Sequence, residues 1–161
     1  MSIIETTIKI WESNRQRTLA TLDEIAKHPN ATEILGWRPG PGRAHIAWQL
    51  VHVGITEELF ATERILQTSA AFSDLVPRFK GGSTPDDDIP SVEMIRTVLN
   101  ESREHLKATI SKFNDTELDN VPEPLRERNW SIGKVIQVMA WHEPHHQGQA
   151  HITFNLWKAQ Q

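Results

Sequence analysis

The chain has 161 residues, a formal net charge of −4 and 38% hydrophobic residues, which is typical of a globular protein with one core. We therefore expect a single domain over residues 1–161. The sequence contains no cysteine, so disulfides and thiolate metal sites are excluded and any metal site must use His, Asp or Glu. The Lys and Arg residues are scattered and form no basic face, so we expect no nucleic-acid partner.

The amino-terminal segment, residues 1–6, has no basic patch followed by an apolar run. It therefore does not have the pattern of a signal peptide. No stretch of the chain approaches the roughly 18 consecutive apolar residues that a membrane-spanning helix needs. We expect no membrane partner and a cytoplasmic location.

Apolar residues recur at helical spacing in four long segments, and no segment alternates in the way that a strand does. The first segment covers about residues 4–25, and the second covers about residues 43–68. The third begins after Ser91, a good N-cap residue, and its apolar stripe continues to residue 113. The fourth covers about residues 131–158. This pattern predicts an all-α fold, a four-helix bundle.

The connection between the second and third predicted helices is long, with about 20 residues that include Gly81-Gly82 and the acidic run 86–88. Extended, it would reach roughly 65 Å, which exceeds the roughly 40 Å length of the helices. We therefore expect helices two and three to run parallel, joined by a long crossover connection along the bundle.

Four of the eight histidines lie in one stretch of the fourth helix, residues 142–151. His142 and His146 are about 40° apart on a helix surface, one turn from each other, so both can bind one divalent ion. On the second helix, His52 shares the apolar stripe with Trp48. Burying imidazoles without partners is costly, and a shared metal ion removes that cost. We expect His52, His142 and His146 to form a metal site between helices two and four.

The other histidines have weaker patterns around them. His145 lies about 60° from His142 on the helix surface, so it is an alternative to His146 as a ligand. His45 lies one heptad before His52, and we expect it to be structural or to support a ligand from behind. The remaining histidines are expected to be structural or at the surface: His28, His105 and His151.

A metal-bound imidazole usually donates its other ring nitrogen to a fixed acceptor. Near the predicted ligands, three side chains are candidates for such a contact: Glu143, Gln149 and His45. Within the fourth helix, Pro144 removes the hydrogen bond to the carbonyl of Ala140. Because the helical spacing directs Pro144 to the outer face, we expect water to satisfy that carbonyl.

The string His142-Glu143-Pro144-His145-His146 also matches H-E-x-x-H, the pattern of zinc peptidases. Continued to His151, it is one residue shorter than the metzincin pattern, and the shortening rotates His151 away from the other histidines. A proline inside that helix is uncharacteristic of those enzymes. Only ten residues follow His151, too few for a Met-turn and its subdomain. We therefore do not interpret the motif as a protease signature.

Two stretches resemble motifs of the DinB-like family of metal-binding four-helix bundles, which includes YfiT-type proteins and bacterial low-molecular-weight-thiol transferases. Residues 46–52, Ile-Ala-Trp-Gln-Leu-Val-His, are similar to the second helix of that family, and residues 142–149 are similar to its H-x-x-x-H-R-G-Q segment. The helix order agrees as well, so the resemblance covers most of the chain. It implies that His52, His142 and His146 are metal ligands and that the protein is a homodimer. Gln147 stands where the family motif has arginine.

Three neutral imidazoles with an open coordination position are typical of a catalytic zinc site. Zinc or nickel is the expected ion, and iron and manganese stay open. With the resemblance, this predicts a metal-dependent enzyme, a thiol S-transferase or a hydrolase, in which the ion lowers the pKa of a bound thiol or water. The partner is then a small-molecule substrate, with a low-molecular-weight thiol as one candidate. The alternative is a non-catalytic metal- or small-molecule-binding protein. The sequence identifies no catalytic residue beyond the ligands.

Overall fold

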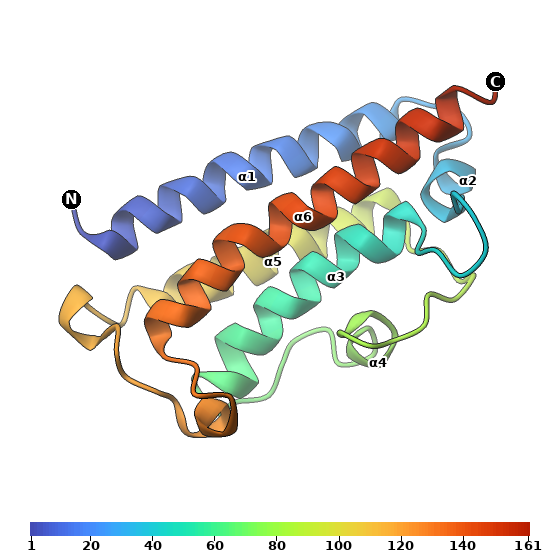
Figure 1. The fold of residues 1–161 in the computed structure, drawn as a ribbon. Coiled ribbons are helices and arrows are strands. Elements are labelled where there is room, and N and C mark those ends of the chain that lie inside the picture. The colour runs from blue at the N-terminus through green and yellow to red at the C-terminus, as the bar shows by residue number, and fades with distance from the viewer.

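The computed structural model describes all 161 residues, and its regular elements are all helical, which confirms the predicted all-α class. Figure 1 shows four long helices side by side. These are α1 (Ile3–Ala26), α3 (Ile46–Leu59), α5 (Val92–Ile110) and α6 (Ile132–Lys158). The short elements are α2 (Ala31–Gly36), α4 (Val76–Phe79), a π-helical turn η1 (Phe60–Arg64) and two 3₁₀ turns, η2 (Asp115–Glu117) and η3 (Glu123–Arg128). None of the helices is long and apolar enough to cross a membrane.

Serine side chains begin three of the long helices. Ser2 and Glu5 form a capping box at the start of α1, in which each side chain bonds to the backbone N–H of the other residue. The hydroxyls of Ser91 and Ser131 accept from the backbone of α5 and α6 in the same way. The predicted starts of the third and fourth helices are therefore confirmed.

The second predicted helix, expected over residues 43–68, is shorter in the structure. Its N-cap is His45, and the π turn η1 follows its last residue, Leu59. His45 Nδ1 accepts a hydrogen bond from the backbone N–H of Trp48 at 3.0 Å, so α3 starts at Ile46 and not at residue 43. His45 Nε2 donates to the carbonyl of Asp86 at 2.8 Å. Both ring nitrogens of His45 are thus used to hold the fold. After Leu59 the chain widens into η1, so the regular helix does not reach residue 68.

The buried hydrophobic residues form two clusters, one toward each end of the molecule. One cluster contains Leu22 near the end of α1 and Ala150 in the second half of α6, together with Leu50 and Leu99 from the first halves of α3 and α5. The other contains residues from the opposite halves of α1, α5 and α6, together with η1, which follows α3: Trp11, Phe60, Leu106, Ile110, Val135 and Met139. Helices α1 and α6 therefore run in one direction, and α3 and α5 run in the other, as Figure 1 also shows.

Between the two clusters lies a layer of four buried charges, one from each long helix, which we call the core ion network: Arg15, Glu57, Arg103 and Glu143. Each of these residues is at most 5% exposed. Arg15 binds Glu57 at 2.9 Å and Glu143 at 2.7 Å, and Arg103 binds the same two carboxylates. Burial lowers the pKa of Arg103, but the two carboxylates outweigh it and raise this pKa above its ordinary value. The two positive and two negative charges compensate each other inside the core.

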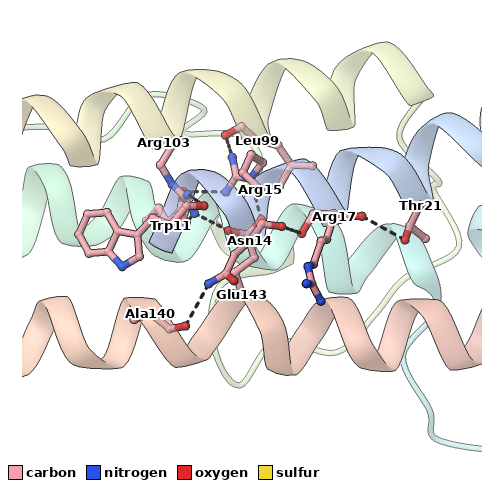
Figure 2. Close-up of polar contacts among 11 residues, drawn as sticks. Trp11, Asn14, Arg15, Arg17, Thr21, Leu99, Arg103, Ala140 and Glu143 are labelled. Carbon is pink, nitrogen blue, oxygen red and sulfur yellow. Dashed lines mark hydrogen bonds and ion pairs between the residues drawn. The ribbon is translucent and has the colours of Figure 1, made fainter. Parts of the chain in front are cut away.

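Pro144 lies inside α6 and leaves the backbone carbonyl of Ala140 without its helical partner. Helix α6 continues without a break through Pro144, whose ring is exposed as expected. The carbonyl of Ala140 accepts a hydrogen bond from Asn14 Nδ2 of α1 at 3.2 Å (Figure 2). A side chain of α1, which the sequence did not predict, thus takes the place of the lost helical partner.

We predict that Glu143→Gln destabilises the protein by about 3–5 kcal/mol, because it leaves two buried guanidinium groups with one carboxylate. Urea unfolding of metal-free protein at pH 7 measures this change. Asp23→Asn is the control, because Asp23 pairs with Arg96 at the surface and such pairs contribute about 0–1 kcal/mol. Equal stability of Glu143→Gln and Asp23→Asn would contradict a structural role for the network.

Candidate metal centre

Three histidines from two helices meet at one point in the structure. His52 comes from α3, and His142 and His146 come from successive turns of α6. One ring nitrogen from each histidine lies within 4.8 Å of the others. The Nε2 atoms of His52 and His142 are 3.1 Å apart and face each other. The three residues singled out in the sequence are therefore neighbours in space, and together they could hold a metal ion.

Two of these imidazoles are held from behind by carbonyl oxygens. His52 Nδ1 donates to the backbone carbonyl of Phe79 at 2.7 Å, and His146 Nδ1 donates to Gln49 Oε1 at 2.5 Å. Each bond places the proton on Nδ1 and leaves the Nε2 lone pair free toward the cluster. Phe79 ends α4, so the connection between α3 and α5 supplies one of the two acceptors.

The residues expected to support the ligands lie elsewhere. Gln149 is one step removed: its Oε1 accepts from Gln49 Nε2 at 2.9 Å, and Gln49 is the residue that contacts His146. Both carboxylate oxygens of Glu143 bind arginines of the core ion network. His45 caps α3. We expected one of these three residues to contact a ligand histidine directly, and this expectation was wrong. Gln49 makes that contact instead, to His146.

The protonation state of the cluster suits a metal ion. Burial lowers the pKa of His52. Burial and the neighbouring imidazoles together lower the pKa of His142 to about 4 and that of His146 to about 3. All three rings are therefore neutral at pH 7, and neutral imidazole is the form that binds metal.

The distance between the Nε2 atoms of His52 and His142 is also compatible with a shared metal ion. Two imidazole nitrogens that share a tetrahedral zinc ion at about 2.0–2.1 Å are about 3.3 Å apart, close to the 3.1 Å between His52 and His142. In metal-free protein His142 Nε2 can donate its proton to His52 Nε2, and a bound cation would take the place of that proton between the two nitrogens. The donor set of the site thus fits a divalent metal ion.

The remaining histidines lie outside the cluster. His145 is exposed, and its ring stacks on Trp141 with 4.7 Å between the centroids, so the structure favours His146 over His145 as the partner of His142. His105 binds the buried carboxylate of Glu58 at 2.6 Å. The other two have no polar partner in the cluster: His28, which packs edge-on against Phe154 and Trp157, and the exposed His151.

The cluster opens onto a cavity of about 560 Å³ between α3, η1, the connection 65–91 and α6. His52 and His142 are part of its wall, and so are aromatic residues of η1 and α6. The indole of Trp48 lies parallel to the His52 ring at 4.5 Å. A small molecule in this cavity would therefore lie against His52 and His142.

A family model described as the DinB superfamily matches residues 10–150 of the sequence. The chain belongs to the DinB superfamily. The comparisons found no match among curated proteins and no match among solved structures. Gln147, which replaces the arginine of the family motif, donates to Thr21 Oγ1 of α1 at 3.3 Å and so is engaged with α1.

We predict that the protein binds about one divalent ion per chain and that His52→Ala, His142→Ala and His146→Ala each lose it, because each variant removes one of three ligands. Elemental analysis after dialysis measures metal content. His145→Ala is the matched control from the same helix and should keep the ion. Undiminished metal in any of the three variants would remove that residue from the site.

Gln49→Ala should lower metal affinity by about tenfold or more, since removing the acceptor behind a ligand imidazole typically costs that much. Gln149→Ala should have a smaller effect, because Gln149 acts through Gln49. Competition with a chromogenic chelator gives the affinities, and Gln137→Ala, an exposed glutamine of α6, serves as the control. An affinity unchanged in Gln49→Ala would show that the contact to His146 does not support the centre.

Proposed function

We propose that this protein is a metal-dependent enzyme that joins a low-molecular-weight thiol to a small electrophile, with His52, His142 and His146 as its metal ligands. One observation carries the proposal: two of the three clustered histidines, His52 and His142, form part of the wall of a cavity of about 560 Å³. Cavities of roughly 300–1,000 Å³ are typical of small-molecule sites. A structural ion is normally closed off by its four ligands and needs no such access.

The bound ion, zinc or nickel first and iron or manganese as further candidates, would supply a positive charge that lowers the pKa of a thiol or water molecule. The protein holds the imidazoles ready for it through Gln49 and the carbonyl of Phe79. None of the three ligands is anionic, so the site leaves the positive charge available to a thiolate. Because the chain has no cysteine, the nucleophilic sulfur would come from a small molecule.

The family membership supports a wider interpretation of the fold. We propose that α1, α3, α5 and α6 form the four-helix bundle of the superfamily, with residues 65–91 as the crossover between its second and third helices. In Figure 1 this connection returns along the molecule past α4. Homodimer formation remains a prediction from the family resemblance.

The test offers metal-loaded protein a panel of low-molecular-weight thiols with a chromogenic electrophile and, in parallel, ester and amide substrates without thiol. We expect turnover that requires both thiol and metal and that falls by about 100-fold or more in His142→Ala. His145→Ala should keep full activity. Turnover of esters or amides alone would assign a hydrolase instead. No turnover with zinc, nickel, iron or manganese would overturn the enzyme proposal in favour of a metal- or small-molecule-binding protein.

A further inference from the structure

The cavity beside the histidine cluster carries an excess of positive charge. Three basic side chains contribute to its wall, Arg64, Arg128 and Lys80, against one acidic side chain, Glu63. None of the three basic groups forms an ion pair, whereas other arginines of the chain, such as Arg78, do. No carboxylate therefore lies within ion-pair distance of these three basic groups.

Two of these cations are positioned by aromatic rings. The guanidinium of Arg64 lies 4.3 Å from the ring centroid of Phe60, and that of Arg128 lies 5.6 Å from the ring of Trp130. The rings of Phe60 and Trp130 stack on each other, with 5.9 Å between centroids and 6° between planes. We call these four residues the cation–aromatic stack. All four are part of the cavity wall.

This arrangement holds the arginines without using their hydrogen-bond donors. A ring attracts a guanidinium through its face, so the N–H groups at the edge stay free for a ligand. Neither Arg64 nor Arg128 donates a hydrogen bond to a protein acceptor. Burial and the charge of Arg128 lower the pKa of Arg64, and the charge of Glu63 offsets this only in part. The two guanidinium groups therefore repel each other. An anion between them would relieve this repulsion.

The backbone around the stack is irregular on both sides. Phe60 and Arg64 begin and end the π turn η1, and π turns inside helices occur frequently at functional sites. Arg128 and Trp130 flank Asn129, which adopts a left-handed conformation with φ of 50° at the end of η3. These two deviations bring side chains from distant parts of the sequence onto the same wall.

Residues of the cation–aromatic stack and of the histidine cluster lie along the same side of one continuous helical segment. His52, Thr56, Phe60 and Arg64 recur every four residues along one side of α3 and η1, and all of them are part of the cavity wall. The run covers about 18 Å of helix. A ligand in the cavity can thus have one group at the arginines and another part toward the histidines.

We infer that the cation–aromatic stack is a binding subsite for a carboxylate or phosphate group, so that the substrate or the thiol co-substrate of this protein is a small organic anion. Arg64 and Arg128 bind the anionic group through charge-assisted hydrogen bonds, and Lys80 adds a third positive charge. The inference rests on the proposed function insofar as it takes this cavity as the substrate site. Anion binding itself does not depend on metal or turnover.

The test is calorimetric titration of the full chain, both metal-free and metal-loaded, with succinate, inorganic phosphate and uncharged succinamide. We expect at least one of the two anions to bind, and succinamide to bind at least tenfold more weakly. Arg64→Gln and Arg128→Gln should each weaken anion binding by about tenfold or more, the loss typical of a charge-assisted hydrogen bond. Arg64→Lys should restore part of it. Arg126→Gln is the matched control, because Arg126 is an exposed residue of the same turn that is not part of the cavity wall.

Which anion binds more tightly distinguishes a carboxylate from a phosphate ligand. Metal content should stay unchanged in Arg64→Gln, which shows that the variant is folded. Binding that is equal in Arg64→Gln and the wild type, or equal for succinate and succinamide, would overturn the inference. Absence of anion binding up to 10 mM, about the concentration at which a millimolar site would be saturated, would overturn it too. Anion binding that requires Arg64, in a protein without turnover, would support the subsite and overturn only the proposed function.

Discussion

The core ion network is the constraint on which the arrangement of the helices depends. It takes one charged residue from each long helix, and both guanidinium groups are compensated only when all four residues lie at the same level along the helices. A shift of α6 by one residue would turn Glu143 by about 100° and move it about 1.5 Å, which would leave buried arginines without a partner. Glu143 directly follows His142, and Glu57 lies five residues after His52. The register that pairs these charges is therefore the register that brings the histidines together.

The histidine cluster depends on that register and on contacts from outside α3 and α6. The carbonyl of Phe79 reaches His52 from the connection after α3, and the left-handed turn at Asn129 presents Arg128 and Trp130 to the same cavity. The long connections thus contribute to the same cavity as α3 and α6, with a hydrogen-bond acceptor for His52 and with two side chains of its wall. The cavity has His52 and His142 on one part of its wall and basic side chains that form no ion pair on another, which is the arrangement that the proposed small anionic substrate would need.

Sequence alone predicted what depends on helix geometry. The helical class, the serine cap at residue 91, the start of the fourth helix near residue 131, and the meeting of His142 with His146 all follow from patterns within one segment. The core ion network left a signal that was missed: Arg103 lies on the apolar stripe between Leu99 and Leu106, where a charge needs a buried partner. Gln49 left a weaker signal, a buried amide three residues before His52. The carbonyl of Phe79 left none, since a main-chain acceptor is the same in every residue and only the tertiary fold places it.

The central claim is that the three histidines share one divalent ion, and anomalous diffraction from crystals of metal-loaded protein at the absorption edge of the metal tests it most directly. The account predicts one strong peak between α3 and α6, within about 2.3 Å of a ring nitrogen of His52, His142 and His146. It also predicts that His52 keeps its bond to the carbonyl of Phe79. A peak elsewhere, or a peak that touches fewer than three of these histidines, would contradict the account.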